Sequence, residues 1–181
     1  MLKLRKVRES DLEKIMNWRM KPDVTKYMYT DPVITIEQQK KWFLSVEKDA
    51  SRYDWIIQYN GTDIGLLTIS DVDEKNSKCS WAYYIGETDL RGQGLGRILE
   101  CNVYDFVFGH LSLNKLCCEV FAFNDKVVKI HEHFGMRREG YYRQHIIKNE
   151  EKFDVVTMAI LKEEWELLRI GAKYEQAEFE L

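Results

Sequence analysis

The 181-residue sequence lacks the features that mark export, membrane insertion and a disulfide framework. Its two prolines form no Pro-rich linker, and no apolar run approaches the roughly 18 residues that suggest a membrane-spanning helix. The N-terminus, MLKLRKVRESDL, is charged from its third residue, so nothing in it predicts export. The four cysteines, Cys79, Cys101, Cys117 and Cys118, have no CxxC spacing, which predicts reduced thiols in a cytoplasmic protein.

An excess of charge of one sign is also missing, because 27 Lys and Arg residues face 30 Asp and Glu residues, a formal net charge of −3. Such a balance supplies no field that draws in nucleic acid or an anionic membrane, so we expect neither as a partner. We expect no metal site, since His131 and His133 are only two residues apart and cannot share one face of a helix.

The hydrophobic residues, 45% of the chain, suffice for one domain with a substantial core. Alternation predicts a first strand at Leu2 to Val7. Two capping boxes, Ser10 with Glu13 and Thr35 with Gln38, predict where the next two helices begin.

The rest of the chain alternates between strand and helix patterns. Two strands in YDWIIQYNGTDIGLLTIS meet at Asn60-Gly61, a dipeptide favoured in the tight turn of a hairpin, and KCSWAYYI is a third. A helix from Leu95 to about Gly109, the strand KLCCEVFAF and a short helix with Asn124 as its cap and Gly135 at its end follow. Two strands around a turn at Lys148 to Glu150 and a helical tail complete the chain. This order predicts a single mixed α/β domain.

The stretch YYIGETDLRGQGLGRILE has glycines at alternate positions, Gly92, Gly94 and Gly96, between a strand pattern and a helix pattern. Such a turn exposes unpaired N–H groups at the positive end of the helix dipole, which suits a phosphate or a pyrophosphate. The spacing is not that of a P-loop, and Arg97 stands where the dinucleotide fingerprint has its third glycine. Taken alone, the glycines are equally consistent with a tight strand-to-helix turn that binds nothing.

The pattern Arg91-x-x-Gly94-x-Gly96, at this place in the strand and helix order, resembles the acetyl-CoA pyrophosphate loop of the GCN5-related N-acetyltransferase (GNAT) superfamily. The resemblance runs from Leu2 to Trp165 and includes NDKVVKIHEHFGM. It implies a GNAT domain over residues 1–165, followed by a C-terminal helical tail over 166–181. The implied fold is a central mixed, mostly antiparallel twisted sheet of about seven strands flanked by helices.

The resemblance also implies acetyl-CoA as co-substrate and assigns the residues that hold it. The Ile85-Gly86 edge of the fourth strand would pair with the pantetheine arm, and Asn124 would contact the same arm. Asn124 can equally be only a helix cap. Together with the pyrophosphate loop, the assigned residues are Ile85, Gly86, Arg91, Gly92, Gln93, Gly94, Leu95, Gly96, Arg97 and Asn124.

Within the superfamily, EGYYRQHIIKNEEKFDVVTMAILKEEW resembles the branch that contains ribosomal-protein alanine acetyltransferases and spermidine acetyltransferases. A narrower resemblance is carried by NWRMKPDVTKYMYTDPVIT, YYIGETDLRGQGLG, KLCCEVFAFN and KIHEHFGMRREG. It is to the N-acetyltransferases of pseudaminic acid biosynthesis. This implies the 4-amino group of UDP-4-amino-4,6-dideoxy-N-acetyl-β-L-altrosamine as the acceptor.

The residue types near the N-terminus suit such a nucleotide-linked amino sugar. Its uracil can stack on aromatic rings, its diphosphate suits Arg or Lys, and its 6-methyl group is apolar. The candidate acceptor-binding residues are Trp18, Arg19, Lys26, Tyr27, Met28 and Tyr29; for each one the alternative is core packing or a surface ion pair. A polyamine would ask for a cluster of carboxylates, and residues 17–35 contain only Asp23 and Asp31, which mildly disfavours spermidine.

Acetyl transfer to an amine needs a base, an oxyanion donor and an acid for the departing thiolate. The resemblance assigns the oxyanion donor to the backbone of the fourth strand. Alternation places Glu119 on one strand face with Cys117 and Phe121, and Glu119 is the candidate base unless it only forms an ion pair; Asp71, Asp73 and Ser80 are weaker candidates. The superfamily usually has a tyrosine where this chain has His131, so His131 either acts as the acid or merely fills the site.

A different class of function remains open at this point. A catalytically inactive acyl-CoA-binding module would keep the same glycine loop, although candidate acid and base residues favour an enzyme. The oligomeric state, a homodimer included, is left open by the sequence.

Overall fold

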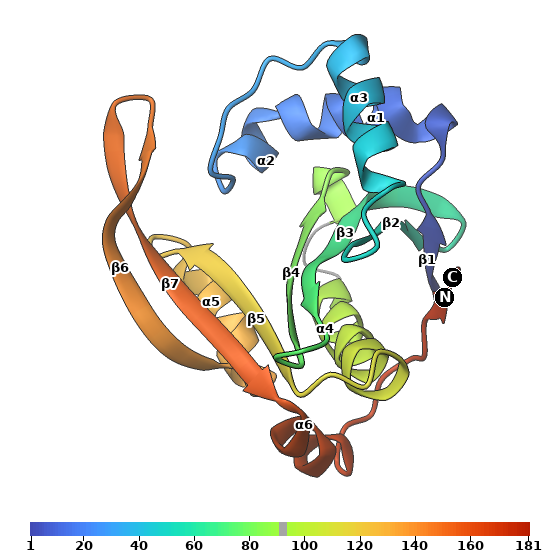
Figure 1. Cartoon of the computed structure of the whole chain (residues 1–181), viewed down its shortest axis with the longest axis vertical. Helices are drawn as coiled ribbons and strands as arrows, with labels where there is room; N and C mark the ends of the chain where they lie inside the picture. The colour runs from blue at the N-terminus through green and yellow to red at the C-terminus, as the bar shows by residue number, and fades with distance from the viewer. Residues whose placement is uncertain (91–93) are drawn as a thin grey trace. The chain divides into compact units, whose positions relative to one another are not determined.

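The computed structural model describes residues 1–90 and 94–181 (Figure 1). Its strands form one mixed sheet of eight strands in the order β6-β7-β5-β4-β3-β2-β1-β8, flanked by helices. The chain divides into two compact units. The first unit comprises Met1–Ser70, Ala82–Gln93 and Ala177–Leu181, and the second comprises Asp71–Trp81 and Gly94–Gln176.

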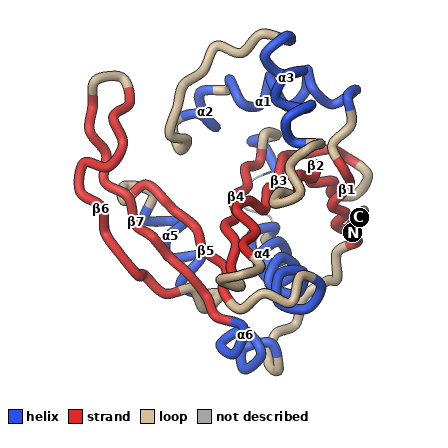
Figure 2. Tube along the Cα trace, viewed as in Figure 1, coloured by secondary structure: helices blue, strands red, loops and turns tan. Residues whose placement is uncertain are grey.

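The first unit is built on the antiparallel strands β1, β2 and β3, with α1 and α3 packed together (Figure 1). The hairpin turn has Asn60 at φ 49° and Gly61 at φ 83°, as the Asn-Gly dipeptide predicts. A long loop joins α2 to α3 (Figure 2). The elements that begin in this unit are β1 (Leu2–Lys6), a 3₁₀ turn (Glu9–Asp11), α1 (Leu12–Met20), α2 (Pro22–Thr25), α3 (Ile36–Val46), β2 (Tyr53–Tyr59), β3 (Thr62–Asp73) and a second 3₁₀ turn (Thr88–Leu90).

One of the two predicted capping boxes is confirmed and the other is wrong. Thr35 accepts a hydrogen bond from the Gln38 N–H, and the Gln38 side chain accepts one from the Thr35 N–H, at the start of α3. At α1 the chain instead makes a 3₁₀ turn before the helix begins at Leu12. Its polar anchor is the buried Asp11, whose carboxylate accepts the Arg8 N–H and pairs with Arg5. The buried guanidinium therefore decides where this helix starts, rather than Ser10.

The second unit is built on β5, β6 and β7, with α5 against β5 (Figure 1). The long β6–β7 hairpin turns at Asn149 and Glu150, with φ of 51° and 66°, within the predicted turn (Figure 2). The parallel β4–β5 ladder pairs 78–80 with 115–117, and β4 then continues to Ile85. The bounds are β4 (Lys78–Ile85), α4 (Leu95–Asp105), a π-helical turn (Phe106–His110), β5 (Lys115–Phe121), α5 (Asp125–His133), β6 (Arg137–Lys148), β7 (Glu151–Leu161) and α6 (Lys162–Arg169).

The end of the chain differs from the predicted helical tail. α6 ends at Arg169, and a short strand β8 (Glu178–Phe179) then pairs in parallel with β1. The Phe179 ring meets Trp55 edge-on at 5.4 Å, and the Trp55 indole N–H donates to the Glu180 carbonyl at 2.9 Å. Where the sequence predicted the end of a helix, these long-range contacts hold an eighth strand.

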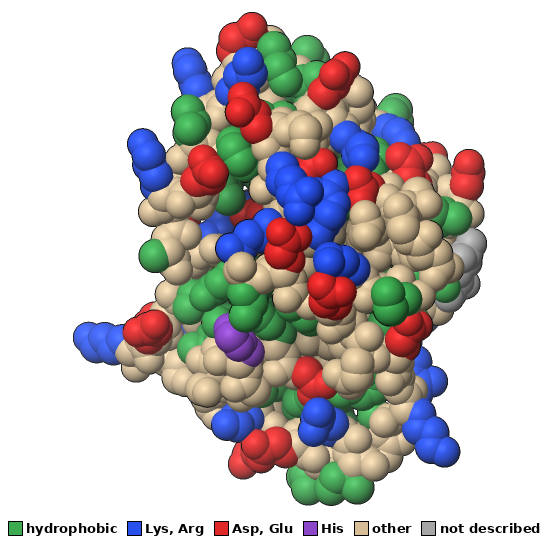
Figure 3. Space-filling model, turned by 90° about the vertical axis from the view of Figure 1, so that its right-hand side faces the viewer, with side chains coloured by type: hydrophobic (Ala, Val, Ile, Leu, Met, Phe, Trp, Pro, Cys, Tyr) green, Lys and Arg blue, Asp and Glu red, His purple; other side chains and the backbone are tan. Residues whose placement is uncertain are grey.

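The structure can be compared with the expectations about surface charge, membrane-spanning helices, disulfides and metal binding. On the face shown in Figure 3, basic and acidic side chains lie intermingled. Within residues 1–90 and 94–181, no helix is both long and apolar enough to cross a membrane. The four cysteines are free thiols, and the described residues contain no group of three or more His, Cys, Asp or Glu placed to hold a metal ion.

Candidate functional site

The described part of the glycine loop ends in an open helix N-terminus. Gly94 precedes α4 in the left-handed conformation, with φ 77°, and a Cβ there would meet nothing within 4 Å among the described residues. In the same part of the chain, no side chain caps α4 and no acidic residue lies in its first turn. A bare backbone at the positive end of an 11-residue helix fits a phosphate group. The predicted residues Arg91, Gly92 and Gln93 lie outside the described residues.

The next three residues of the loop have different roles. The Leu95 side chain is buried, so only its backbone can face a ligand. Gly96 is half-buried and the Arg97 side chain is exposed. The Arg97 N–H donates to the Gly94 carbonyl at 3.2 Å, which closes the first turn of α4.

Asn124 begins α5 without using its side chain as a cap. Its carbonyl accepts the N–H groups of Val127 and Val128 at 3.0 and 3.2 Å. Its side chain makes no capping hydrogen bond within the described chain. The helix-cap interpretation of Asn124 therefore holds for its backbone position alone, and its half-buried amide can serve a ligand.

His131 lies near the end of α5 in a buried polar cluster. Only 4% of His131 is exposed, and its Nδ1 lies 2.5 Å from Oε1 of Glu100 on α4. The Glu100 side chain is fully buried, and its Oε2 accepts the Tyr104 hydroxyl at 2.5 Å. The Trp81 ring meets the imidazole edge-on, with ring centres 5.6 Å apart. We call His131, Glu100 and Tyr104 the His131 cluster.

The His131 cluster keeps the imidazole charged. Burial by itself would lower the pKa of His131, but the neighbouring Cys118 and Glu100 side chains raise it to about 10. Burial and the adjacent Glu100 carboxylate raise the pKa of Tyr104 well above its ordinary value, so its hydroxyl stays a donor. At neutral pH the site therefore holds a proton on a histidine, which is what a general acid needs.

Sequence reasoning named His131 but missed Glu100. The available signal was a carboxylate in the largely apolar helical run LGRILECNVYDFVF, four residues before Tyr104 and so on the same helix face. A glutamate at such a position needs a buried partner.

Glu119, the candidate base, is exposed on β5, opposite Thr157 of β7. The side chain of its neighbour Cys118 lies beside His131, and successive side chains of a strand point to opposite faces. Glu119 and His131 therefore lie on opposite faces of β5, and the structure does not bring them together. Of the weaker candidates, Asp73 accepts two hydrogen bonds from Asn76 in a turn.

In the first unit, Trp18 is a core residue. It is 2% exposed, and a Cβ at Gly86 would lie 2.2 Å from the Trp18 ring. Its indole N–H donates to Glu87 at 2.5 Å. The core-packing alternative therefore describes Trp18, which is buried against Gly86. The Gly86 N–H donates to the Ile64 carbonyl at 2.7 Å, and the Gly86 carbonyl accepts Lys21 Nζ at 2.8 Å.

Arg19 fastens the loop that follows α2. Its guanidinium donates to the Thr30 carbonyl at 3.3 Å and to the Thr30 hydroxyl at 2.9 Å. Burial lowers the pKa of Arg19, although the nearby Tyr84 and Asp31 oppose this shift. Arg19 is thus a positioning residue for the loop that carries the other candidates.

The remaining acceptor candidates lie on the segment 26–29 that follows α2. Lys26 is exposed, with its Nζ 4.8 Å from the centre of the Tyr27 ring and 3.6 Å from Asp23. Tyr27 is 39% exposed, whereas Met28 and Tyr29 are half-buried. This segment therefore offers an accessible aromatic ring beside a cation.

An open pocket of about 410 Å³ in the first unit was not anticipated from the sequence. Among the candidates for acceptor binding it includes only Trp18. Its lining residues are Ser10, Glu13, Lys14, Asn17, Trp18, Lys21 and Glu87.

Comparisons with known proteins agree on the kind of domain. The family model described as "Acetyltransferase (GNAT) domain" matches residues 1–137. The uncharacterized N-acetyltransferase p20 of Bacillus licheniformis is 25% identical over 169 residues, which cover 91% of this chain and 94% of that protein. The acetyltransferase PseH of Campylobacter jejuni is 26% identical over 151 residues, covering 81% and 92%.

The crystal structure of spermidine N-acetyltransferase from Vibrio cholerae in complex with CoA and spermine is similar in fold. It superimposes with a TM-score of 0.85 at 22% sequence identity, covering 91% of this chain and 98% of that chain. At this identity the likeness is one of architecture.

Proposed function

Because the chain belongs to the acetyltransferase (GNAT) family, we propose that it acetylates the 4-amino group of UDP-4-amino-4,6-dideoxy-N-acetyl-β-L-altrosamine, as in pseudaminic acid biosynthesis. The protein is an acetyl-CoA-dependent N-acetyltransferase. The observation that carries the choice of acceptor is the accessible segment 26–29, where a lysine lies against a tyrosine ring. The resemblance of NWRMKPDVTKYMYTDPVIT to the pseudaminic acid N-acetyltransferases supports it.

Acetyl-CoA supplies the acetyl group and, as its thiol, the leaving group. We assign its pyrophosphate to the start of α4, where Gly94 leaves the backbone bare and no described side chain caps the helix. The side-chain amide of Asn124 is assigned to the pantetheine arm. The backbone of β4 near Ile85 is assigned to the same arm, and the Gly86 N–H donates to the Ile64 carbonyl.

Two residues move protons in this proposal. His131 holds a proton at neutral pH and gives it to the departing sulfur. Glu119, the proposed base, lies on the exposed face of β5, opposite the face next to His131, and takes the proton of the acceptor ammonium through water.

The acceptor contacts are assigned to the loop after α2. We assign Lys26 to the diphosphate, Tyr27 and Tyr29 to the uracil, and Met28 to the methyl group. Arg19 acts through the loop, by holding Thr30. Trp18 has no part in stacking, because it is buried against Gly86.

Spermidine is the competing acceptor, since the same fold occurs in a spermidine N-acetyltransferase. Against it, residues 17–35 offer only two carboxylates, Asp23 and Asp31. A ribosomal-protein N-terminus is a second alternative within the family. An inactive acyl-CoA-binding module would bind acetyl-CoA without releasing thiol for any amine.

A panel assay tests the proposal by measuring CoA release with UDP-4-amino-sugars, spermidine and peptide N-termini. We expect the highest kcat/KM with the UDP-4-amino-sugar. We also expect Tyr27→Ala and Lys26→Ala to raise the KM for that acceptor while the KM for acetyl-CoA stays unchanged. Lys40→Ala, at an exposed lysine of α3 in the same unit, is the matched control and leaves both constants unchanged. Faster turnover of spermidine or a peptide would contradict the assignment of the acceptor.

A further inference from the structure

The feature that the mechanism leaves unexplained is Glu100, a carboxylate with no exposed surface in the middle of α4. The residues on either side of it, Leu99 and Cys101, are buried as well. Water cannot solvate a carboxylate there, and an ionised carboxylate is costly to bury unless both of its oxygens find donors. The position therefore requires specific partners.

Both oxygens of Glu100 have such a partner, from different elements. Tyr104, one helical turn further along α4, donates its hydroxyl to Oε2 at 2.5 Å. His131 of α5 lies with Nδ1 2.5 Å from Oε1. The carboxylate thus links the helix that begins at the glycine loop to the helix that carries the candidate acid.

We propose that Glu100 is a positioning residue that holds the His131 ring by Nδ1, so that Nε2 is the nitrogen that gives up its proton to the departing thiolate. This inference rests on the proposed function of His131 as the acid. A carboxylate accepts hydrogen bonds only, so Nδ1 keeps its hydrogen in the charged ring and in the neutral ring. When the Nε2–H bond breaks, its electron pair stays on Nε2 and the proton forms the S–H bond of CoA.

Together with Cys118, Glu100 also favours the protonated form of the ring. The groups that shift the titration of His131 come from two elements, Glu100 of α4 and Cys118 of β5. The neutral Trp81 ring of β4 packs edge-on against the imidazole. Because burial alone would lower the pKa of His131, loss of the Glu100 charge is expected to lower it from about 10.

The test compares Glu100→Gln with Glu100→Asp and Tyr104→Phe. Nitrogen NMR of the four-histidine protein reports both the pKa of His131 and the nitrogen that keeps its hydrogen. In Glu100→Gln we expect the pKa of His131 to fall by about 1 to 3 units. The basic limb of the pH–kcat profile should move to lower pH by the same amount. The KM for acetyl-CoA stays unchanged. Glu100→Asp keeps the charge and retains part of the high pKa, and Tyr104→Phe, which leaves the carboxylate in place, keeps the pKa high.

Asp105→Asn is the matched control. Asp105 also lies on α4, and its carboxylate accepts hydrogen bonds from Trp165, Arg169 and Tyr174. We expect this variant to lose stability while the pKa of His131 and the basic limb stay where they are. If Glu100 has only a structural role, Glu100→Gln will likewise lose stability without a change in the pKa of His131.

The outcomes separate this inference from the choice of acceptor. An unchanged pKa of His131 in Glu100→Gln, or a lowered pKa without a matching move of the basic limb, overturns the positioning role. The NMR titration needs no substrate, and the pH profile is measured with whichever amine the wild-type protein acetylates. A wrong acceptor therefore shows in the panel assay and leaves the comparison of variants intact. If Glu100→Gln does not fold, a low pKa of His131 in Glu100→Asp overturns the inference as well.

Discussion

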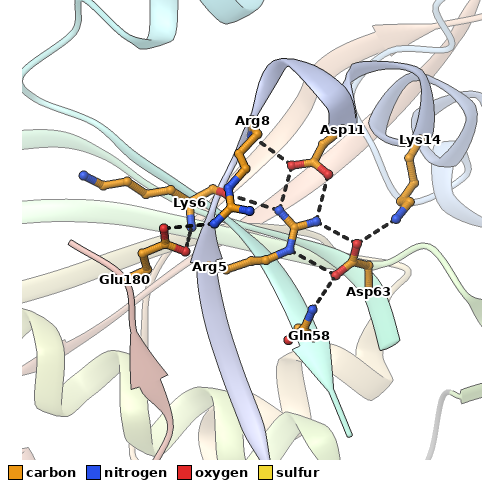
Figure 4. Close-up of polar contacts among 8 residues, drawn as sticks. All are labelled: Arg5, Lys6, Arg8, Asp11, Lys14, Gln58, Asp63 and Glu180. Atoms are coloured by element: carbon orange, nitrogen blue, oxygen red, sulfur yellow. Dashed lines mark hydrogen bonds and ion pairs between the residues drawn. The ribbon is translucent and has the colours of Figure 1, made fainter. Parts of the chain in front are cut away.

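Each unit of the molecule contains a buried charge cluster, and the two clusters are built differently. In the first unit, Arg5 donates to both oxygens of Asp11 at 2.8 Å and to both oxygens of Asp63 at 3.1 and 2.6 Å (Figure 4). Lys14 and Gln58 complete the contacts of Asp63 at 2.6 and 3.0 Å. We call this the Arg5 cluster. The His131 cluster of the second unit has one carboxylate, one imidazole and one phenol.

The Arg5 cluster and the His131 cluster differ in whether their cation can give up a proton. A guanidinium stays protonated at every pH a protein meets, and Arg5 is committed to two carboxylates at once. Burial would raise the pKa of Asp11 and of Asp63, but the hydrogen bonds from Arg5 lower both. The Arg5 cluster therefore fastens β1, α1 and β3 together. An imidazole exchanges its proton within an accessible range, so the His131 cluster can perform acid chemistry.

The largest expected effect comes from removing the cation of the Arg5 cluster. Arg5→Ala leaves two carboxylates buried without their main partner, which is expected to lower the free energy of unfolding by about 3 to 5 kcal/mol. Urea unfolding measures the loss. Lys3→Ala, which removes an exposed pair with Glu178, is the control and should cost less than about 1 kcal/mol. If Arg5→Ala has wild-type stability, the Arg5 cluster does not stabilise the fold.

Removing the imidazole of the His131 cluster is expected to affect the rate of reaction. His131→Phe should lower kcat by at least about tenfold, because general acid catalysis typically contributes about 10² to 10⁴-fold. The Kd for acetyl-CoA should not change, and His131→Tyr should restore part of the activity. Steady-state kinetics and a binding titration measure the two quantities. A Phe variant with near-normal kcat and an unaltered pH profile would exclude His131 as the acid.

The two clusters are expected to lose their stabilising effect at opposite ends of the pH scale. The pKa of His131 is raised from about 6.5 to about 10, so its contribution is full below pH 6.5 and is lost as pH rises through 10. The pKa values of Asp11 and Asp63 are lowered, so their contribution is present above about pH 3.8 and is lost as pH falls. Unfolding measured between pH 5 and 11 should show a smaller alkaline loss in His131→Phe than in wild type. Equal losses would contradict the charged state of the imidazole.

The smallest expected effect on stability is at the glycine before α4. In Gly94→Ala the Cβ meets no described atom within 4 Å, so only the left-handed φ of 77° opposes it, at about 1 kcal/mol. The larger Gly94→Val should raise the KM for acetyl-CoA strongly, because it covers the backbone assigned to the pyrophosphate. Gly171→Ala, at another glycine with open space around it, is the control for both measurements. Unchanged affinity for acetyl-CoA in a folded Gly94→Val would remove the loop from the proposal.

Sequence reasoning succeeded where a few neighbouring residues decide the structure. The Asn60-Gly61 turn, the Thr35 capping box and Gly135, which follows α5 with φ 99°, all reflect local backbone preferences. The order of strands and helices follows from apolar periodicity, which also depends on neighbours. These local signals were enough to predict a mixed α/β domain with the glycine loop between a strand and a helix, whereas the mixed sheet was implied by the family resemblance.

It failed where a residue's role depends on a distant partner. The start of α1 follows from the pairing of Asp11 with Arg5, and the packing of Trp18 against Gly86 is the alternative that the sequence could not choose over an acceptor contact. Neither partner leaves a periodic or motif signal in the sequence. Such roles are decided by which side chains folding brings into one dry environment.

The sequence by itself determined the family, the element order and the turn residues of this protein, because each of these depends on spacing along the chain. Only the tertiary structure decided that the last residues form β8 beside β1, and that Glu100 meets His131. Both are contacts across 31 residues or more, selected by apolar burial and by the cost of an unpaired buried charge. That cost makes the partner of a buried carboxylate a property of the fold.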